Sequence, residues 1–292
     1  MKFKDALKHR DFVITAQMKL IEAPDAESLI TQGQMLQPVV DAVQLPDNSS
    51  AKLQMSSLAA AALLIPLGID PIVHMTSRDR NRIALGRDLV GAAAIGVSSV
   101  LIRRGRKMQK RETVDVQSVF DIPALKFMMY IQSLKQSNDN LLAPDFLIGA
   151  KASVLNPEPD WTPNNLIRKC DAGVNFIQYP ICFDMDLVRS HMARMVELKL
   201  THRVNFMMTL STLPSASEAC RLRDSGDGLP IPESIIDRME QASDPEGEGI
   251  EICAELLREL DSIPGVSGVN LTTTGRLASI PAAIEASGLS RT

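Results

Sequence analysis

DPIVHMTSRDRNRIALGRDLVGAAAIGVSSVLIRR, residues 70–104, holds the pattern that decides the fold. A short, largely apolar run at 70–76 precedes a helical stretch at 78–96, and a second such run follows at 98–104. The two runs are continuously apolar rather than alternating, which is typical of parallel strands covered on both faces. Gly96 stands where the helical pattern stops, and glycine adopts a left-handed C-cap without steric cost. The stretch therefore predicts one strand–helix–strand unit with parallel strands.

The same rhythm continues along all 292 residues. Eight runs are predicted as strands: 12–17, 39–45, 70–76, 98–104, 145–151, 174–182, 203–210 and 268–274. Helical patterns separate them at 26–38, 51–68, 78–96, 121–136, 163–173, 185–199 and 245–262, and Gly68 and Gly173 close two of these. Eight strand–helix units in a chain of this length predict an α/β fold, a (β/α)8 TIM barrel forming a single domain over 1–292.

Two features complete this prediction. An open doubly wound sheet is the alternative, but no predicted strand is followed by a GxGxxG turn. Turn-rich segments around 225–249 are expected to extend the connection after the seventh strand.

Composition narrows the function classes. The net charge of −4 and an aromatic content of 4% argue against a nucleic-acid partner, which needs a broad basic surface and stacking side chains. No run reaches the length of a membrane span, and the N-terminal stretch 1–12 is too charged for a signal peptide. We therefore expect a cytoplasmic protein with no membrane partner.

The cysteines and histidines give no sign of a metal site. The four cysteines lack CxxC pairing, and the four histidines lack HxH or HExxH spacing. We expect reduced thiols and no bound metal.

A basic run marks the expected functional face. Six basic side chains lie between residues 103 and 111, directly after the strand predicted at 98–104. Active sites of TIM barrels lie at the C-terminal ends of the strands. We expect Arg103, Arg104 and Arg106 to bind an anion through charge-assisted hydrogen bonds. The later basic residues Lys107, Lys110 and Arg111 are expected to be solvated.

Several segments together resemble the methylenetetrahydrofolate reductase family, particularly its short bacterial and acetogen-type forms. They are PDNSSAKLQMSSLAAA (46–61), IVHMTSRDRNRIAL (72–85), FLIGAK with a following Asn-Pro (146–157), LIRKCDAGVNFIQ (166–178), STLPS (211–215) and IPESIIDRMEQASDPEGEGIEICAELLREL (231–260). Their order and register extend the resemblance over nearly the whole chain.

The resemblance implies a flavoprotein oxidoreductase of one-carbon (tetrahydrofolate) metabolism. Members of this family are TIM barrels that hold FAD at the C-terminal strand ends. They pass hydride from NADH, NADPH or another electron donor to the flavin, and from the flavin to 5,10-methylenetetrahydrofolate. The implied partners are a folate-type substrate, an electron donor, and either further copies of the chain or a partner subunit.

The resemblance also implies where the cofactor binds. It assigns these residues to cofactor binding: His74, Thr76, Arg103, Arg104, Gly105, Asn165, Arg168 and Lys169. His74 and Thr76 correspond to positions that line the flavin. Asn165, Arg168 and Lys169 correspond to a helix that meets the ribose, diphosphate or adenine, where cations and donors suit a dianionic diphosphate.

The reacting end of the implied site departs from the family. Gln17 stands where the family has its proton-donating carboxylic acid, and Arg106 stands where it has an acid near flavin N1. The family has a folate-contacting glutamine at the position of Pro180, and Gln178 lies two positions before it. Pro46 replaces a threonine that is common at the end of the family's second strand. We take Gln17, Arg106 and Gln178 as the positions where the reaction occurs.

These departures leave more than one function open. The first is a reductase-type enzyme with a modified proton path, working in either direction between 5,10-methylene- and 5-methyltetrahydrofolate. The second is a catalytically silent family member that binds folate, a nucleotide or a partner subunit. A third is a barrel enzyme acting on another methyl carrier or a related pterin.

Overall fold

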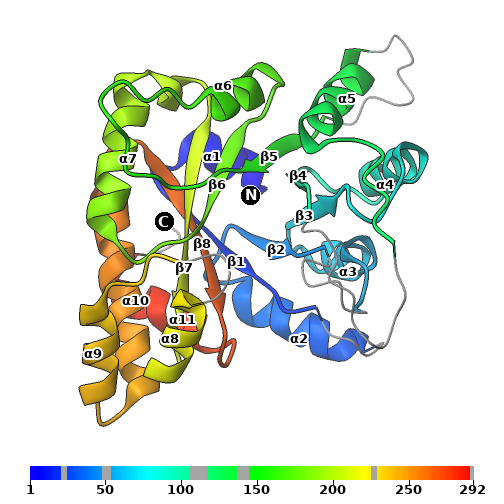
Figure 1. Ribbon diagram of the computed structural model, residues 1–292. Helices are drawn as coiled ribbons and strands as arrows, with labels where there is room; N and C mark the ends of the chain where they lie inside the picture. Colours follow the sequence, from blue (N-terminus) through cyan, green and yellow to red (C-terminus); the bar gives the residue numbers. More distant parts are fainter. Residues whose placement is uncertain (21–24, 48–53, 106–116, 137–144, 225–228, 290–292) are drawn as a thin grey trace.

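The computed structural model describes residues 1–20, 25–47, 54–105, 117–136, 145–224 and 229–289, and within them it is a closed barrel of eight parallel strands (Figure 1). The strands are β1 (Val13–Gln17), β2 (Ala42–Leu45), β3 (Pro71–Thr76), β4 (Ser99–Arg103), β5 (Leu147–Lys151), β6 (Phe176–Ile181), β7 (Asn205–Thr212) and β8 (Val266–Thr273). Each strand pairs with the next, and β8 closes on β1. The predicted TIM barrel and the position of every predicted strand are confirmed.

Helices surround the barrel. They are α1 (Phe3–His9), α2 (Ala26–Leu36), α3 (Ser57–Leu64), α4 (Arg82–Ala94), α5 (Ala124–Gln136), α6 (Asn164–Asp171), α7 (Met185–Glu197), α8 (Ala216–Arg223), α9 (Glu233–Gln241), α10 (Pro245–Ser262) and α11 (Ser279–Ser287), with 3-10 turns at Ile65–Leu67 and Leu200–His202. Gly68, Gly96 and Gly173 have left-handed φ angles of 75°, 92° and 80°, as predicted for residues that end helices.

Four helices were not predicted: α1, α8, α9 and α11. The structure places α9 within 225–249, where turns were expected before the helix predicted at 245–262, and residues 225–228 lie outside the described part. Asp244 begins α10 because its side chain accepts the Gly247 N–H at 3.1 Å.

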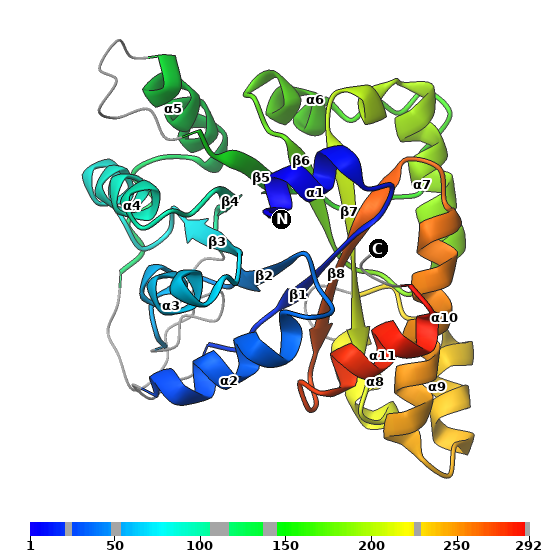
Figure 2. The ribbon, with the colours of Figure 1, turned by 180° about the vertical axis from the view of Figure 1, so that it is seen from behind.

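The N-terminal end of the barrel is closed by α1 (Figure 2). The Phe3 ring packs edge-to-face on Phe176 at 5.4 Å between centroids, and both rings are fully buried. Gly149 of β5 faces the same space, and a Cβ there would lie 2.1 Å from the Phe176 ring. We call the contacts among Phe3, Phe176 and Gly149 the apolar plug, which fills the N-terminal end of the barrel. The buried polar side chains of the interior lie nearer the C-terminal end.

Candidate functional site

A layer of polar side chains crosses the barrel interior above the apolar plug. It consists of Thr15, Gln44, His74, Gln178, Thr209 and Asn270, all buried and each from a different strand. Gln44 is central, because its amide nitrogen donates to Gln178 Oε1 at 2.8 Å and Thr15 Oγ1 at 3.1 Å. Gln178 in turn donates to Thr209 Oγ1 at 3.4 Å. The predicted site residue Gln178 therefore lies in the interior, with both ends of its amide engaged.

His74 is fully buried in this layer and is neutral. Its Nε2 lies 3.0 Å from Gln44 Oε1, and because an amide oxygen only accepts, Nε2 carries the hydrogen. Burial, with the nearby Arg103 and Lys151 cations, holds the pKa of His74 well below its usual value. Its Nδ1 is a buried acceptor that has no partner among the described residues.

β4 and β5 each end in a basic residue that faces the inside of the barrel at its mouth. Side chains alternate along a strand, so Arg103 follows buried Leu101, and Lys151 follows Gly149, on the inner face. Gln17 is the corresponding residue of β1, which lies opposite β5 in the closed strand order, and it is half-buried. The mouth thus carries Gln17, Arg103 and Lys151.

A cavity of about 930 Å³ opens at the C-terminal ends of β4–β6. Its polar side chains include Arg103, Lys151, Asn164, Asn165, Lys169 and His191, and the only tryptophan in the sequence, Trp161, also lines it. No carboxylate lines it in the part of the chain that the structure describes. The cavity is therefore suited to an anionic ligand.

Two lysines in this cavity have lowered pKa values. Burial, followed by repulsion from Arg103, lowers the pKa of Lys151 to about 7. Burial also lowers the pKa of Lys169, whose Nζ donates to the Lys151 carbonyl oxygen at 2.5 Å. Lys151 was not among the predicted site residues, although its place as the last residue of a predicted strand was a usable signal.

The expected cofactor residues on α6 divide between two faces. Asn165 and Lys169 line the cavity, whereas Arg168 is exposed and does not line it. The structure thus brings Asn165 and Lys169 together with Arg103, and leaves Arg168 apart.

The two described residues after β4, Arg104 and Gly105, do not line the cavity. The Arg104 guanidinium lies 5.4 Å from the centre of the Phe120 ring, and Arg104 is exposed. Gly105 has a φ of 80°, and a Cβ there would lie 2.5 Å from Thr76 Cγ2 and 2.8 Å from Arg78 Cβ. Only glycine fits this close approach to β3. Residue 106 and those up to 116 lie outside the described residues, so the expected role of Arg106 stays a prediction.

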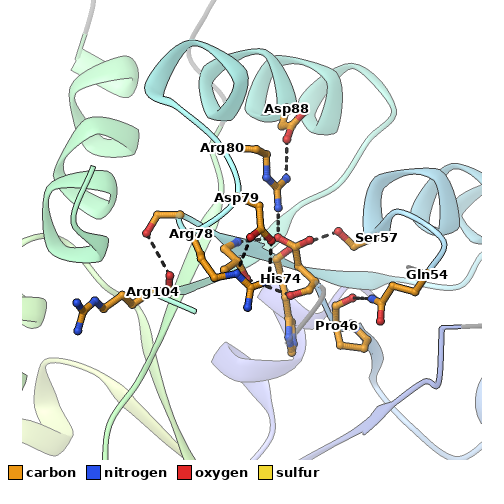
Figure 3. A network of polar contacts seen from close by, with 12 residues as sticks. Pro46, Gln54, Ser57, His74, Arg78, Asp79, Arg80, Asp88 and Arg104 are labelled. Carbon is orange, nitrogen blue, oxygen red and sulfur yellow. Dashed lines mark hydrogen bonds and ion pairs between the residues drawn. The ribbon is translucent and has the colours of Figure 1, made fainter. Parts of the chain in front are cut away.

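Figure 3 shows a network of polar contacts that includes Arg80 and Asp88 of α4. Thr76 of β3 joins this network through Asp47, which follows β2. The Asp47 carboxylate accepts the Thr76 N–H at 2.7 Å, and Thr76 Oγ1 donates to the Asp47 carbonyl oxygen at 3.1 Å. Arg80 pairs with both Asp47 and Asp88. Burial raises the pKa of Asp47, and the Arg80 charge opposes this rise. Thr76 is buried in this network and does not line the cavity.

His191 forms one wall of the cavity and is held at both ring nitrogens. Nε2 lies 2.8 Å from the Tyr179 hydroxyl, and Nδ1 lies 3.0 Å from the Leu155 carbonyl oxygen. Burial lowers the pKa of His191. Tyr179 follows inward-facing Gln178 on β6, so its hydroxyl points outward to His191 of α7, whereas Pro180 lines the cavity.

Other features bear on the remaining predictions. All four cysteines are free thiols, of which Cys182 and Cys253 are buried. The described residues contain no cluster of side chains suited to a metal ion. Among the described helices, none is long and apolar enough to cross a membrane.

Comparison with known proteins identifies the family. The model of the methylenetetrahydrofolate reductase family matches residues 28–288. The chain belongs to this family. A curated relative, a probable methylenetetrahydrofolate reductase (NADPH) of Caenorhabditis elegans, is 25% identical over 247 residues, which are 82% of this chain and 35% of the relative. The chain thus spans about a third of that relative's length.

Solved structures agree on the fold. A Clostridium thermocellum protein that binds two copies of 5-methyl-5,6,7,8-tetrahydrofolic acid is similar over 97% of both chains, with a TM-score of 0.64 and 14% identity. DmoA from Hyphomicrobium sulfonivorans is similar over 94% of this chain and 85% of its own chain, with a TM-score of 0.56 and 9% identity. At such identities the likeness supports the barrel fold alone.

Proposed function

We propose that this family member is a FAD-dependent oxidoreductase that transfers hydride between flavin and the one-carbon unit of 5,10-methylene- or 5-methyltetrahydrofolate. The observation that carries the proposal is the cavity at the C-terminal ends of β4–β6, lined by three basic side chains and by no carboxylate among the described residues. Family membership and the folate-binding structural neighbour support the same chemistry.

The residues present fit a flavin dinucleotide. The cavity volume of about 930 Å³ lies at the upper end of the range for small-molecule sites, as a large cofactor requires. Arg103 and Lys169 would offset the diphosphate charge, and Asn165 would supply amide hydrogen bonds. A bound flavin supplies reversible hydride transfer, chemistry that no side chain in the cavity offers.

The protein's own residues prepare the site in two further ways. Neutral His74 keeps an unpartnered acceptor beneath the mouth, available to a donor group or a water molecule. The apolar wall from Trp161, Leu166 and Leu229 lowers the water content around a bound ring. NADH or another electron donor, and a cytoplasmic location, belong to the same proposal.

The single tryptophan gives a direct test. Trp161 lies in the cavity wall, so its fluorescence reports a ligand that enters the cavity. We expect saturable quenching when FAD is added, and a yellow protein after gel filtration. Unchanged fluorescence and a colourless protein would reject flavin binding.

A second candidate is a folate-binding protein that does not reduce its ligand. Gln17 at the family's acid position and the absence of a carboxylate from the described cavity wall favour it. This candidate predicts that 5-methyltetrahydrofolate quenches Trp161 while FAD does not. Quenching by both ligands supports the oxidoreductase.

A further inference from the structure

We propose that Lys151 is the proton donor that opens the imidazolidine ring of 5,10-methylenetetrahydrofolate in this protein, in place of the carboxylic acid whose position Gln17 occupies. The inference rests on the proposed function and deepens it, because it assigns the proton step to a particular side chain.

The position of Lys151 suits this role. It ends β5 on the inner face of the barrel, at the mouth, and lines the cavity. In the closed strand order β5 lies opposite β1, so Lys151 and Gln17 face the mouth from opposite sides. A substrate held over the mouth would lie between the position that lost its acid and the lysine.

The surroundings of Lys151 prepare its amine to release a proton. Arg103 on β4 repels the ammonium form, as its effect on the pKa of Lys151 shows. His74 on β3 is close enough to feel the Lys151 charge and is neutral, and Lys169 on α6 contacts the Lys151 backbone. Among the described residues, no carboxylate pairs with the Lys151 amine to hold its proton. An amine that titrates near pH 7 both loses and regains its proton readily at neutral pH.

The other candidates at the mouth are less suited. Gln17 has no acidic proton, and His74 is held neutral and fully buried. His191 is engaged at both ring nitrogens, and the Lys169 amine is bound to a carbonyl oxygen. The Cys182 thiol also lines the cavity, but burial raises its pKa to about 12, and Arg103 does not release a proton at neutral pH. Lys151 is the remaining proton carrier in the described wall of the cavity.

The proton step balances. The bond between N10 and the methylene carbon breaks, and its electron pair goes to N10, which takes a proton from the Lys151 ammonium. The products are a neutral Lys151 amine and a cationic N5 iminium, so the total charge is unchanged. Solvent then returns a proton to the amine. In the oxidative direction Lys151 takes the proton back from N10.

The variants Lys151→Arg and Lys151→Met test the assignment. Arginine keeps the positive charge but does not release a proton at neutral pH. A general acid typically contributes about 100-fold to 10,000-fold, so we expect Lys151→Arg to bind 5-methyltetrahydrofolate within a few-fold of wild type while losing at least ~100-fold in kcat. Lys126→Arg is the matched control, because Lys126 is exposed on α5 and does not line the cavity.

A second readout does not depend on turnover. Acetylation of the ligand-free protein at a series of pH values, followed by peptide mass spectrometry, measures when the Lys151 amine becomes reactive. We expect its half-reaction near pH 7, roughly 3.5 units below that of an ordinary exposed lysine. Occupying the cavity with 5-methyltetrahydrofolate should protect it.

The outcomes separate the two proposals. If neither 5-methyltetrahydrofolate nor FAD changes the Trp161 fluorescence of the wild type, the proposed function is wrong and this inference fails with it. If Lys151→Arg binds folate and keeps the wild-type kcat, only the role of Lys151 is overturned, because a positive charge that releases no proton is then enough for turnover. Acetylation of Lys151 only at the pH of ordinary lysines likewise overturns it.

Discussion

Replacing Lys151 with methionine should stabilise the fold at neutral and acidic pH. The folded protein holds the pKa of this amine at about 7, below the 10.5 of a free lysine side chain. Between these values the unfolded chain binds a proton that the folded protein does not, so wild-type stability falls as pH decreases from about 10.5 to 7 and then levels off. Methionine has similar length and no charge, and therefore removes this penalty.

The size of the effect follows from the same shift. Each pKa unit corresponds to about 1.4 kcal/mol, which would give close to 5 kcal/mol for a fully enclosed amine. Because Lys151 is only half-buried and retains some hydration, we expect about 2–3 kcal/mol. The gain in unfolding free energy of Lys151→Met over wild type should be largest at about pH 6 and should shrink by this amount toward about pH 10.

Urea unfolding of wild type, Lys151→Met and Lys126→Met at several pH values measures this difference without any ligand. The exposed Lys126 on α5 controls for removal of a lysine charge. A Lys151→Met difference that does not change with pH, or one that grows as pH rises, would refute the reasoning. If the difference in unfolding free energy depends on pH as predicted, Lys151 destabilises the fold at neutral pH. Such a cost is expected for a residue retained at the barrel mouth for function.

Three further predictions concern the cofactor, the barrel interior and the proton path. Lys169→Ala should weaken FAD binding by about tenfold to hundredfold in the fluorescence titration, and the exposed Arg168→Ala should do so much less; equal losses would assign Arg168 to the cofactor. Gly149→Ala should cost about 1–3 kcal/mol in urea unfolding, because its Cβ overlaps a phenylalanine ring, and wild-type stability would contradict that packing. Gln17→Glu should restore turnover in the Lys151→Met variant, most strongly below neutral pH; no recovery would mean that the two positions do not share the substrate.

The strands were predictable because each is a compact apolar run with a clear end. The missed helices carry weaker signals. The first, FKDALKH, is a single short amphipathic segment whose stability comes from Phe3 packing in the barrel end, a contact that sequence periodicity does not show. The helix α9 lies in a stretch whose prolines and glycines suggested turns only.

The site was predictable in part, for related reasons. The sequence placed Arg103 and Lys169 near one another through the family resemblance, and strand alternation alone would have added Lys151. The role of Gln44 depends on contact with Gln178, 134 residues away, which exists only once the barrel closes. Which of two neighbouring helix residues faces a cavity depends on the rotation of α6, and that separates Lys169 from Arg168.

The central claim is hydride transfer between flavin and folate in this barrel. It is tested most directly by mixing the FAD-loaded protein anaerobically with 5-methyltetrahydrofolate and following the visible absorption of oxidised flavin. The account predicts bleaching of that absorption, slowed when the methyl group carries deuterium. An unchanged flavin spectrum, while Trp161 fluorescence shows that the folate is bound, would contradict it.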